Sequence, residues 1–425
     1  MEHGVIRRWR RSVVAAVALS MSFAVAAVEP AFTCRIGNAD IASDLRTGGA
    51  NTVVALRPNG NPVVAYFNLP PPGTPQTYPP DAALYLHLCE DPECTRGKTK
   101  TLETSVAVAS VDLSIALRAD GAPILSYYSK NPAWPGVRIY VCANAQCSPG
   151  AIRQQTTELE LGVTTHVSIS PEDRPFVVFG DRRPDPPVSL RDDLAACRCT
   201  DAACSSTVCR TLDHSARNGL YPWAIWRTGD GGDGTALISH VGYDGAYAYQ
   251  CANSDCSAGL GHMPHPRPAG AGGGSYSSIV QRTSGLPLIV YGQFYAPPNL
   301  PEYGLPTLVT CADANCTSGT PRALDPAERN LRLVRMAVRP NGRPLVTWGE
   351  TGGADSLYLY QCANRDCTGG RVATTLAGVE VGHDMAMRDD DVAVIAFRPA
   401  QSGKVKLAYC ALPGDLIFAN DFEIP

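Results

Sequence analysis

Short apolar runs alternate along this chain with turns that contain proline, glycine and asparagine, and no helical periodicity separates them. The clearest copies are VVALRPNGNPVVAYFN from residue 53, SIALRADGAPILSYYS from residue 114 and MAVRPNGRPLVTWGE from residue 336. In each copy one apolar run ends at an arginine, a tight turn follows, and a second run carries aromatic residues near its end. Two such runs across a turn predict a β-hairpin.

The hairpin pattern recurs seven times, three of the copies being looser than the rest. Each hairpin is followed by a longer connection, a third run of alternating apolar and aromatic residues, a cysteine-flanked turn and a fourth run. The residue that closes the first run marks the repeat: Arg57, Arg118, Ser170, Arg227, Arg282, Arg339 and Arg388. The mean period of about 55 residues lies in the range that indicates solenoids or propellers.

Four strands per repeat without helices between them predict an all-β fold, a seven-bladed β-propeller. The seventh copy ends at Cys410, where its fourth strand is missing. The segment RIGNADIASDL after Cys34 is similar to the segments that follow the second cysteine of each repeat. We therefore expect residues 34–410 to form the propeller, with the N-terminal strand completing the last blade. Residues 27–33 are then a short N-terminal segment and residues 411–425 a C-terminal tail.

Six cysteine pairs have C-x4-C spacing, at the turn between the third and fourth strands. With a four-residue loop the two cysteines would face each other across the hairpin with Cα atoms about 5 Å apart, which is within disulfide range. Zinc is the alternative, but zinc needs four ligands and neighbouring hairpins lie far apart. We expect disulfides in the pairs Cys89/Cys94, Cys142/Cys147, Cys199/Cys204, Cys251/Cys256, Cys311/Cys316 and Cys362/Cys367.

Four further cysteines predict two more bonds. Cys197 and Cys209 lie outside the third pair and should form a second rung, with a bulge absorbing the uneven spacing. Cys34 and Cys410 should bond to each other and lock the ring. A lipid anchor at Cys34 is disfavoured because the preceding residues fit a lipid-attachment motif poorly and because lipidation would leave Cys410 unpaired.

The N-terminus resembles a secretory signal. Four arginines between residues 7 and 11 precede the apolar run Val13 to Val25, and Ala24-Val25-Ala26 provides a small-x-small cleavage motif, which predicts a signal peptide over residues 1–26. A twin-arginine route has no support from the residues after the arginines. Removal of this segment takes away four arginines and one glutamate, so the net charge changes from −4 to −4 − 4 + 1 = −7.

Composition narrows the partners and the compartment. An acidic, exported chain is a poor nucleic-acid binder, and no later stretch approaches the ~20 apolar residues of a membrane span. We expect a monomer in the periplasm, at the cell surface or outside the cell. No motif predicts a cofactor, and the isolated histidines and aspartates do not predict a metal site.

The repeat unit, strand-G-x-P-x-V-x-Y-Y-D followed by L-x-x-C-x4-C, resembles that of exported bacterial seven-bladed propellers, which are loosely related to sialidase-like and lectin-like propellers. The resemblance covers residues 34–410 and implies the architecture, but little about activity. The Asp-box of sialidases, S-x-D-x-G-x-T-W, is absent, since Thr228 to Gly232 matches only part of it. The tail segment IFANDFE is similar to a C-terminal element of many exported proteins, with Asp421 in place of its glycine.

The two ends of a propeller blade carry different connections. The turns between strands one and two and between strands three and four lie on one face, where we expect the repeated arginines to hold turn carbonyls. The connections between strands two and three lie on the other face and carry aromatic residues such as Tyr78, Trp134, Phe294, Tyr295 and Tyr303. The four long ones span residues 69–80, 130–136, 182–191 and 294–306. Aromatic loops on a rigid scaffold favour a binding surface there.

Two rings of equivalent positions edge that second face. One ring, at the end of the second strands, contains Asn68, Ser129, Asp181, His240, Gln293, Glu350 and Arg398. The other, at the mouth of the first strands, contains Val53, Ser114, His166, Trp223, Ser278, Arg335 and Asp384, with His383 adjacent. Such polar residues can cap their own loops. The ring at the end of the second strands has seven different side chains at equivalent positions, which also predicts an asymmetric pocket. The candidate ligand-binding residues are His166, Trp223, Arg335, Asp384, Glu350, Asp181 and His240.

The sequence therefore favours a secreted, disulfide-stabilised binding module for a glycan or a cell-surface protein. The alternative is a carbohydrate-active hydrolase or lyase at the channel mouth. Such an enzyme would use a carboxylate such as Asp384, Asp181 or Glu350, with His166 or His240 as the acid–base partner.

Overall fold

The computed structural model separates the chain into two units, residues 1–30 and residues 31–425, and the fold belongs to the second. The structure describes residues 29–37, 41, 52–68, 83–104, 106, 113–129, 131, 133–156, 161–185, 189–214, 219–228, 233–242, 244–266, 274–295, 303–327, 330–350, 355–399 and 404–413. The predicted signal peptide, the loop 69–80 with Tyr78, and the IFANDFE tail lie outside these residues and stay predictions. In the described part of the chain no helix is long and apolar enough to cross a membrane.

The described residues form seven four-stranded antiparallel sheets, as predicted. Blade 1 consists of β2 (Val53–Leu56), β3 (Pro62–Asn68), β4 (Ala83–Cys89) and β5 (Gly97–Thr104). Blade 2 consists of β6 (Leu113–Leu117), β7 (Pro123–Ser129), β8 (Gly136–Cys142) and β9 (Gly150–Gln154). Blade 3 consists of β10 (Leu161–Ile169), β11 (Pro175–Asp185), β12 (Ser189–Cys199) and β13 (Thr207–Asp213). Blade 4 consists of β14 (Leu220–Trp226), β15 (Ala236–Gly242), β16 (Gly245–Cys251) and β17 (Gly259–Pro266).

The remaining blades follow the same order. Blade 5 consists of β18 (Gly274–Gln281), β19 (Pro287–Tyr295), β20 (Tyr303–Cys311) and β21 (Gly319–Ala323). Blade 6 consists of β22 (Leu331–Val338), β23 (Pro344–Glu350), β24 (Ser356–Cys362) and β25 (Gly370–Ala377). Blade 7 consists of β26 (Val379–Met387), β27 (Ala393–Pro399), β28 (Lys406–Ala411) and, as its outer strand, β1 (Thr33–Ile36).

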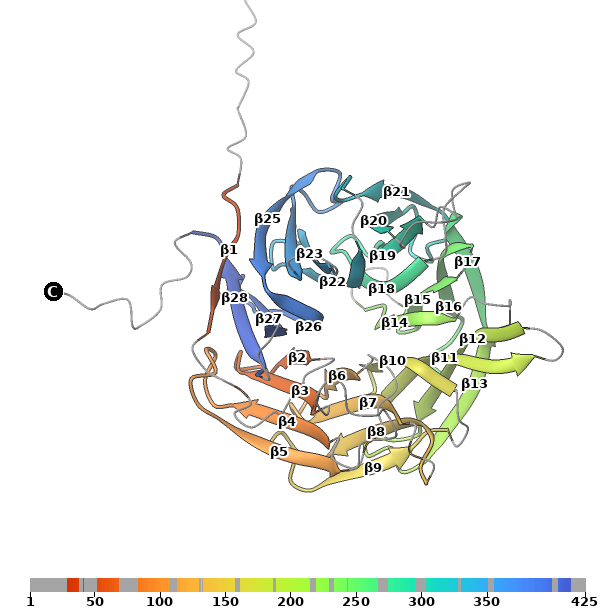
Figure 1. The fold of residues 1–425 in the computed structure, drawn as a ribbon. Coiled ribbons are helices and arrows are strands. Elements are labelled where there is room, and N and C mark those ends of the chain that lie inside the picture. Colours follow the sequence, from red (N-terminus) through yellow and green to blue (C-terminus); the bar gives the residue numbers. More distant parts are fainter. Residues whose placement is uncertain are drawn as a thin grey trace, which may run out of the picture. The chain divides into compact units, whose positions relative to one another are not determined.

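The first strands of all seven blades form the inner ring. Each contacts the first strand of the next blade, in the order β2, β6, β10, β14, β18, β22, β26 and back to β2 (Figure 1). Apolar side chains fill the space between successive blades, for example Tyr276 and Leu308 of blade 5 with Trp348 and Tyr360 of blade 6. The ring of strands thus places the predicted mouth positions around one central channel.

The ring closes as predicted. β1 pairs antiparallel with β28, and Cys34 lies opposite Cys410 with their Cα atoms 4.0 Å apart and their sulfurs bonded. This disulfide joins residues 376 positions apart and therefore fixes the two ends of the propeller to each other. The backbone hydrogen bonds between these two strands also hold the seam, in addition to the covalent bond.

All sixteen cysteines are paired in the eight predicted bonds, and none is free. Besides the seam, Cys197 bonds Cys209 as the second rung of blade 3. The six C-x4-C bonds are Cys89–Cys94, Cys142–Cys147, Cys199–Cys204, Cys251–Cys256, Cys311–Cys316 and Cys362–Cys367, with Cα atoms 4.5 to 4.8 Å apart. The predicted connectivity is therefore confirmed, and so is the Cα separation of about 5 Å.

The hairpin geometry of the six C-x4-C pairs corrects the expectation that the two cysteines face each other across the ladder. The first cysteine of each pair ends the third strand and lies opposite a residue beyond the second cysteine, as Cys142 does opposite Gly150. The second cysteine lies inside the turn in the left-handed conformation, which bends the chain back towards the first sulfur. This holds for Cys94, Cys147, Cys204, Cys256, Cys316 and Cys367.

The same geometry explains the second rung of blade 3. Because Cys199 lies opposite Thr207, the ladder continues in register to Cys197, which lies directly opposite Cys209. The bulge predicted to align these two cysteines is therefore not needed. The expectation was wrong because it took Cys204 as the ladder partner of Cys199, when that residue belongs to the turn.

Parts of two predicted loops are strand. Residues 182–185 and 189–191 belong to β11 and β12, which pair from Phe176↔Arg198 out to Asp185↔Ser189, and residues 294–295 and 303–306 belong to β19 and β20. The prediction of loop was wrong for these residues because proline and charged residues were taken as loop signals. Pairing satisfies the backbone N–H and C=O groups that a long loop would leave to water.

Candidate functional site

Four of the seven candidate residues meet in the central channel. The imidazole of His166 packs against the indole of Trp223 at an interplanar angle of 31°, with ring centroids 3.9 Å apart. The guanidinium carbon of Arg335 lies 4.6 Å from the centroid of Trp223, a cation–π distance. On its other side the Nε of Arg335 is 3.3 Å from the Oδ1 of Asp384. The four side chains come from blades 3, 4, 6 and 7, so Arg335 reaches past the small Ser278 of blade 5.

A pocket opens beside this row of side chains. It is shallow, with about 20 Å³ of enclosed space and about 290 Å³ when open solvent is included. Its lining residues are Leu113, Ser114, Thr165, Tyr221, Pro222, Trp223, Tyr276, Ser277 and Arg335. Most of these residues lie near the start of the first strands, whose other ends reach the arginine turns. The pocket therefore opens on the face that the sequence analysis predicted for binding.

Three ring residues also hold the blades together. The backbone N–H of Val167 donates to the Ser114 hydroxyl at 3.1 Å, that of Ala224 to His166 Nδ1 at 3.2 Å, and that of Val54 to Asp384 Oδ2 at 3.1 Å. Each acceptor comes from the preceding blade. Each of these side chains therefore caps the next strand of the inner ring and also faces the channel. The capping role and the pocket role, which the sequence offered as alternatives, are compatible.

Burial sets the charge of the site. Removal from water, together with the positive charge of Arg335, lowers the pKa of His166 and of His383 to about 3, so both imidazoles are neutral near pH 7. Burial raises the pKa of Asp384, while Arg335 and the backbone N–H of Val54 favour its ionised form. The Nε2 of His383 lies 3.0 Å from the hydroxyl of Thr347 on the preceding blade.

An unusual backbone feature at the mouth was not predicted from the sequence. Tyr221, Tyr276 and Leu333 have φ values of 50°, 46° and 40°, and each stands two residues before a ring position. The strand pairing shifts register at each of them, between Leu220 and Trp223, Ser275 and Ser277, and Arg332 and Val334. Non-glycine residues adopt this left-handed conformation at an energetic cost, and such strain clusters at functional sites.

Tyr221 and Tyr276 form a contact pair within the pocket. Their ring centroids are 4.4 Å apart, and the two rings pack in one apolar cluster with Leu333. The Thr164 hydroxyl accepts the N–H of Tyr221 at 3.1 Å, and the Ser277 hydroxyl donates to its carbonyl at 2.7 Å. Hydrogen bonds from both neighbouring blades thus maintain the strained residue.

The other three candidates lie away from this pocket. The carboxylate of Glu350 accepts a hydrogen bond from the Tyr358 hydroxyl at 2.6 Å. His240 is fully buried and stacks on Tyr247 with centroids 5.3 Å apart. Asp181 is buried and lies opposite Asp193 in the blade 3 sheet. None of the three is among the described residues that line the pocket.

The ring predicted at the end of the second strands also needs a correction, because two of its residues are out of register. In blade 6 Arg335 pairs with Thr347, and Glu350 follows three residues later. In blade 4 Trp223 pairs with Ser239, so the residue equivalent to Glu350 is Gly242, and His240 lies two residues before it in β15. In blade 7 Asp384 pairs with Ala396, which makes Pro399 the equivalent residue in place of Arg398. The first turn of blade 4 is longer, since Arg227 bonds Thr235 where Arg57 bonds Asn61, and this displaced the alignment.

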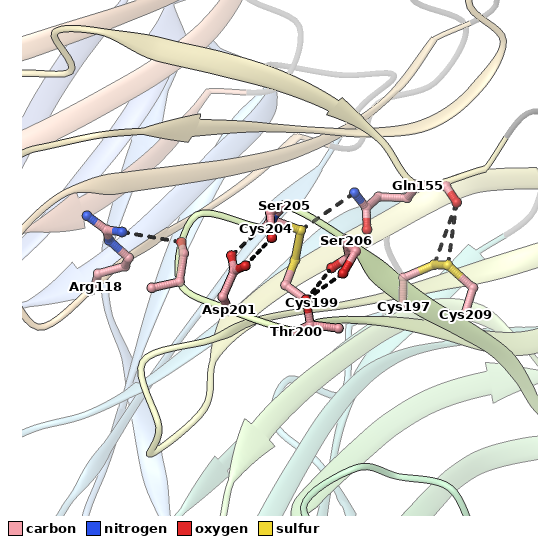
Figure 2. Close-up of a disulfide and its surroundings, with 11 residues drawn as sticks. Arg118, Gln155, Cys197, Cys199, Thr200, Asp201, Cys204, Ser205, Ser206 and Cys209 are labelled. Carbon is pink, nitrogen blue, oxygen red and sulfur yellow. Dashed lines mark hydrogen bonds between the residues drawn. A yellow bond between two sulfur atoms is a disulfide. The ribbon is translucent and has the colours of Figure 1, made fainter.

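The opposite face is built from repeated interblade contacts of arginines, of which the predicted bond to a turn carbonyl of the next blade is one form. Arg57 donates to the carbonyl of Ala145, and Arg118 to that of Ala202, in the cysteine turn of the next blade (Figure 2 shows Arg118 beside the turn of Asp201 and Cys204). Side-chain acceptors replace carbonyls elsewhere around the ring, in the pairs Arg198–Asp255, Arg227–Asn315, Arg282–Asp366, Arg339–Asp391 and Arg388–Glu93. We call these seven contacts the arginine latches. Arg198 replaces Ser170 in blade 3.

The cysteine turns share one local design. In each turn the third residue is aspartate or asparagine, and its side chain accepts backbone N–H groups inside the turn, as Asp313 does from Asn315 at 2.9 Å and Thr317 at 3.2 Å. The second cysteine is left-handed in all six turns, with φ between 49° and 55°. Among the described residues, the potential ligand atoms of His87, Cys89 and Cys94 lie within 4.8 Å of one another, as they would around a metal ion. Both sulfurs, however, belong to the Cys89–Cys94 disulfide.

Comparisons with known proteins define the fold. No family model matches the chain, and no curated protein matches it. A protein of unknown function from Dyadobacter fermentans superposes with a TM-score of 0.54 at 10% identity, over 89% of this chain and 99% of that one. The NanB sialidase of Streptococcus pneumoniae gives 0.47 at 8% identity, over 90% and 70%, and an alpha-L-arabinanase of Penicillium chrysogenum gives 0.46 at 9%, over 90% and 98%. At these identities the likeness is one of fold alone.

Proposed function

We propose that this protein is a secreted binding module whose ligand is a glycan, held in the pocket beside Trp223. The observation that supports the proposal most is the lining of that pocket, which combines three aromatic rings, several hydroxyls and one guanidinium. Aromatic faces pack against the C–H faces of sugar rings, while hydroxyls and guanidinium N–H groups bond sugar hydroxyls. The eight disulfides agree with a compartment outside the cytoplasm.

A hydrolase has less support from the same pocket. Paired-carboxylate hydrolysis needs two carboxyl groups separated by about 5 to 9.5 Å, both facing the substrate. The described lining contains no carboxylate, and Asp384, the nearest acid in the row, pairs with Arg335 and caps Val54. His166 also uses Nδ1 to accept the N–H of Ala224. Asp384 and His166, the two candidate catalytic groups in the channel, thus both make structural contacts.

A glycan array on the full chain tests the proposal. We expect retention of at least one glycan, and loss of that retention in Trp223→Phe combined with Arg335→Gln, because the variant shrinks the aromatic face and removes a charged donor. The matched control is Arg365→Ala, which removes an exposed guanidinium on the cysteine-turn face. A protein that binds no glycan, or whose binding survives the double substitution, would contradict the proposal.

A further inference from the structure

The charges in the channel cancel within the described residues. Arg335 carries a positive charge and Asp384 a negative one, their side chains are 11% and 10% exposed, and they contact each other at 3.3 Å. His166 and His383 beside them are neutral because burial and Arg335 lower the pKa of both. A ligand that brought a net charge into this place would leave one buried charge without a counterion, which is costly.

The size of the pocket limits what can enter. Pockets for drug-sized ligands enclose roughly 300 to 1,000 Å³. This pocket encloses only about 20 Å³, and the empty space of about 290 Å³ around it includes open solvent. Its lining comes from the first strands of adjacent blades and the side chain of Arg335, so it is a shallow depression at the mouth. Such a depression can contact only the end residue of a glycan, because several linked rings would need an extended groove.

The strained tyrosines are specific to this cavity. Tyr221, Tyr276 and Leu333 share one backbone conformation at equivalent positions of three successive blades, but only the two tyrosines line the pocket. The bulge at each position turns the side chain sideways, so that Tyr221 contacts Tyr276 and both pack with Leu333. Leu333 shows that an aliphatic side chain fits the same backbone. Packing alone therefore does not require tyrosine at residues 221 and 276.

Resting on the proposed function, we infer that the pocket selects one uncharged terminal sugar residue, which packs on the Tyr221–Tyr276 pair and bonds Arg335 without displacing Asp384. The tyrosine pair is then the specificity-determining element for the sugar ring. Asp384 acts as a positioning residue, because it neutralises and orients the guanidinium that contacts the ligand. Acidic sugars such as uronates are disfavoured because their carboxylate competes with Asp384 for Arg335.

The charge part is tested by titration calorimetry of the full chain with methyl glycosides of neutral hexoses and pentoses and with methyl glucuronide. We expect at least one neutral glycoside to bind and the glucuronide to bind at least tenfold more weakly. Asp384→Asn, whose amide oxygen can still accept the N–H of Val54, should reverse the preference. Preferential binding of glucuronide by the unsubstituted protein would overturn this inference and leave the glycan proposal standing. Failure of every sugar to bind would overturn both.

The ring part is tested with Tyr221→Leu and Tyr276→Leu, which copy the residue of blade 6. Each should weaken binding of the preferred neutral glycoside about tenfold while the protein stays folded by circular dichroism. The control is Leu333→Ala, which removes packing in the same cluster but does not line the pocket and should leave affinity within twofold. Equal losses in all three variants would contradict the inference. So would affinity that keeps rising when the glycoside is lengthened to three or four residues, because that requires an extended groove.

Discussion

The cysteine-turn face and the channel mouth of this propeller solve different problems with equivalent positions. On the first face all seven blades use an arginine latch, and the six blades with a C-x4-C turn also share a left-handed cysteine and a capping aspartate or asparagine. At the mouth the seven equivalent positions hold six different residue types, from Val53 to Asp384, and only serine occurs twice. Strained bulges occur there at Tyr221, Tyr276 and Leu333, in three adjacent blades. Repetition accompanies a shared structural task, and divergence accompanies the pocket.

The two faces also differ in how they hold their polar groups. The latches tie each blade to a turn of the next blade, at the rim of the ring. The mouth residues Ser114, His166 and Asp384 tie the blades together through single backbone N–H groups while facing the channel. The mouth therefore carries a structural duty and a candidate ligand site in the same side chains. Substitutions there must be judged by stability and binding together.

The largest effect should come from opening the ring at its seam. Because Cys34–Cys410 joins residues 376 positions apart and each hairpin bond only five, chain entropy gives about 6 kcal/mol for the first and about 2 kcal/mol for each of the second. Cys34→Ser with Cys410→Ser should therefore lower the melting temperature more than Cys362→Ser with Cys367→Ser. Calorimetric melting curves compare the two. Equal losses would mean that strand pairing between β1 and β28 closes the ring without help.

A smaller effect is expected from one arginine latch. The side chain of Arg339 is 1% exposed, bonds Asp391 from Nε at 2.9 Å, and lies over Phe32 at 4.6 Å. Arg339→Ala removes the ion pair with Asp391 and the contact with Phe32 at a buried position. It should lower the free energy of unfolding by about 3 kcal/mol. The contrast is Arg365→Ala, an exposed residue of the same face, which should cost under about 0.5 kcal/mol. Chemical denaturation measures both, and similar values would show that the latches are not what stabilises this face.

Acid should weaken the protein through the mouth. The folded pKa of His166 and His383 is lowered to about 3 from an ordinary value of 6.5, so below pH 6.5 the unfolded chain binds protons that the folded one does not. Stability should fall as the pH drops from 6.5 towards 3, by about 2 kcal/mol for each histidine at pH 5. The raised pKa of Asp384 acts in the opposite direction and offsets part of this loss.

Chemical denaturation at pH 7 and at pH 5 measures this loss of stability in acid. His383→Gln, which keeps a group able to bond Thr347, should reduce the acid loss by about 2 kcal/mol. The control is Arg365→Ala on the opposite face, an exposed residue whose substitution should leave the full acid loss in place. An unchanged pH dependence in His383→Gln would contradict the neutral state of the mouth on which the sugar preference rests.

Much of the architecture follows from the sequence because it depends on repetition and covalent pairing. The period marked by Arg57, Arg118 and their equivalents defines the blades, and an unpaired Cys410 beside a displaced Cys34 predicts the closing strand. Errors arose where one blade departs from the repeat. The longer first turn after Arg227 shifted His240 out of register, and the ladder from Asp181 towards Asp185 extends a strand where a loop was expected.

The cysteine turns show a different kind of error, because it recurs in every copy. The C-x4-C spacing predicts which sulfurs bond, since short sequence separation brings them together whatever the turn. It does not predict the ladder register, because that depends on the left-handed second cysteine, as at Cys147, Cys256 and Cys316. Cysteine carries no intrinsic preference for that conformation. The backbone of the turn was therefore beyond the reach of the sequence pattern.

The candidate site was predictable only in part. Ring positions identify which side chains face the channel, and this brought His166, Trp223, Arg335 and Asp384 together. The contact of Arg335 with Trp223 across blade 5 depends on side-chain length and on the small Ser278 between them, which no local pattern encodes. The left-handed bulges at Tyr221 and Tyr276 interrupt the two-residue strand period without glycine, so they leave no turn signal in the sequence.

The separation of the two faces is tested most directly by hydrogen exchange, measured by mass spectrometry with and without the glycan that the array retains. We expect slower exchange in β14 (Leu220–Trp226) and β18 (Gly274–Gln281), which carry Tyr221, Trp223 and Tyr276, and no change in the cysteine turns. Ligand binding that slows exchange at the cysteine turns and leaves β14 and β18 unaffected would place the functional surface on the other face and contradict the account.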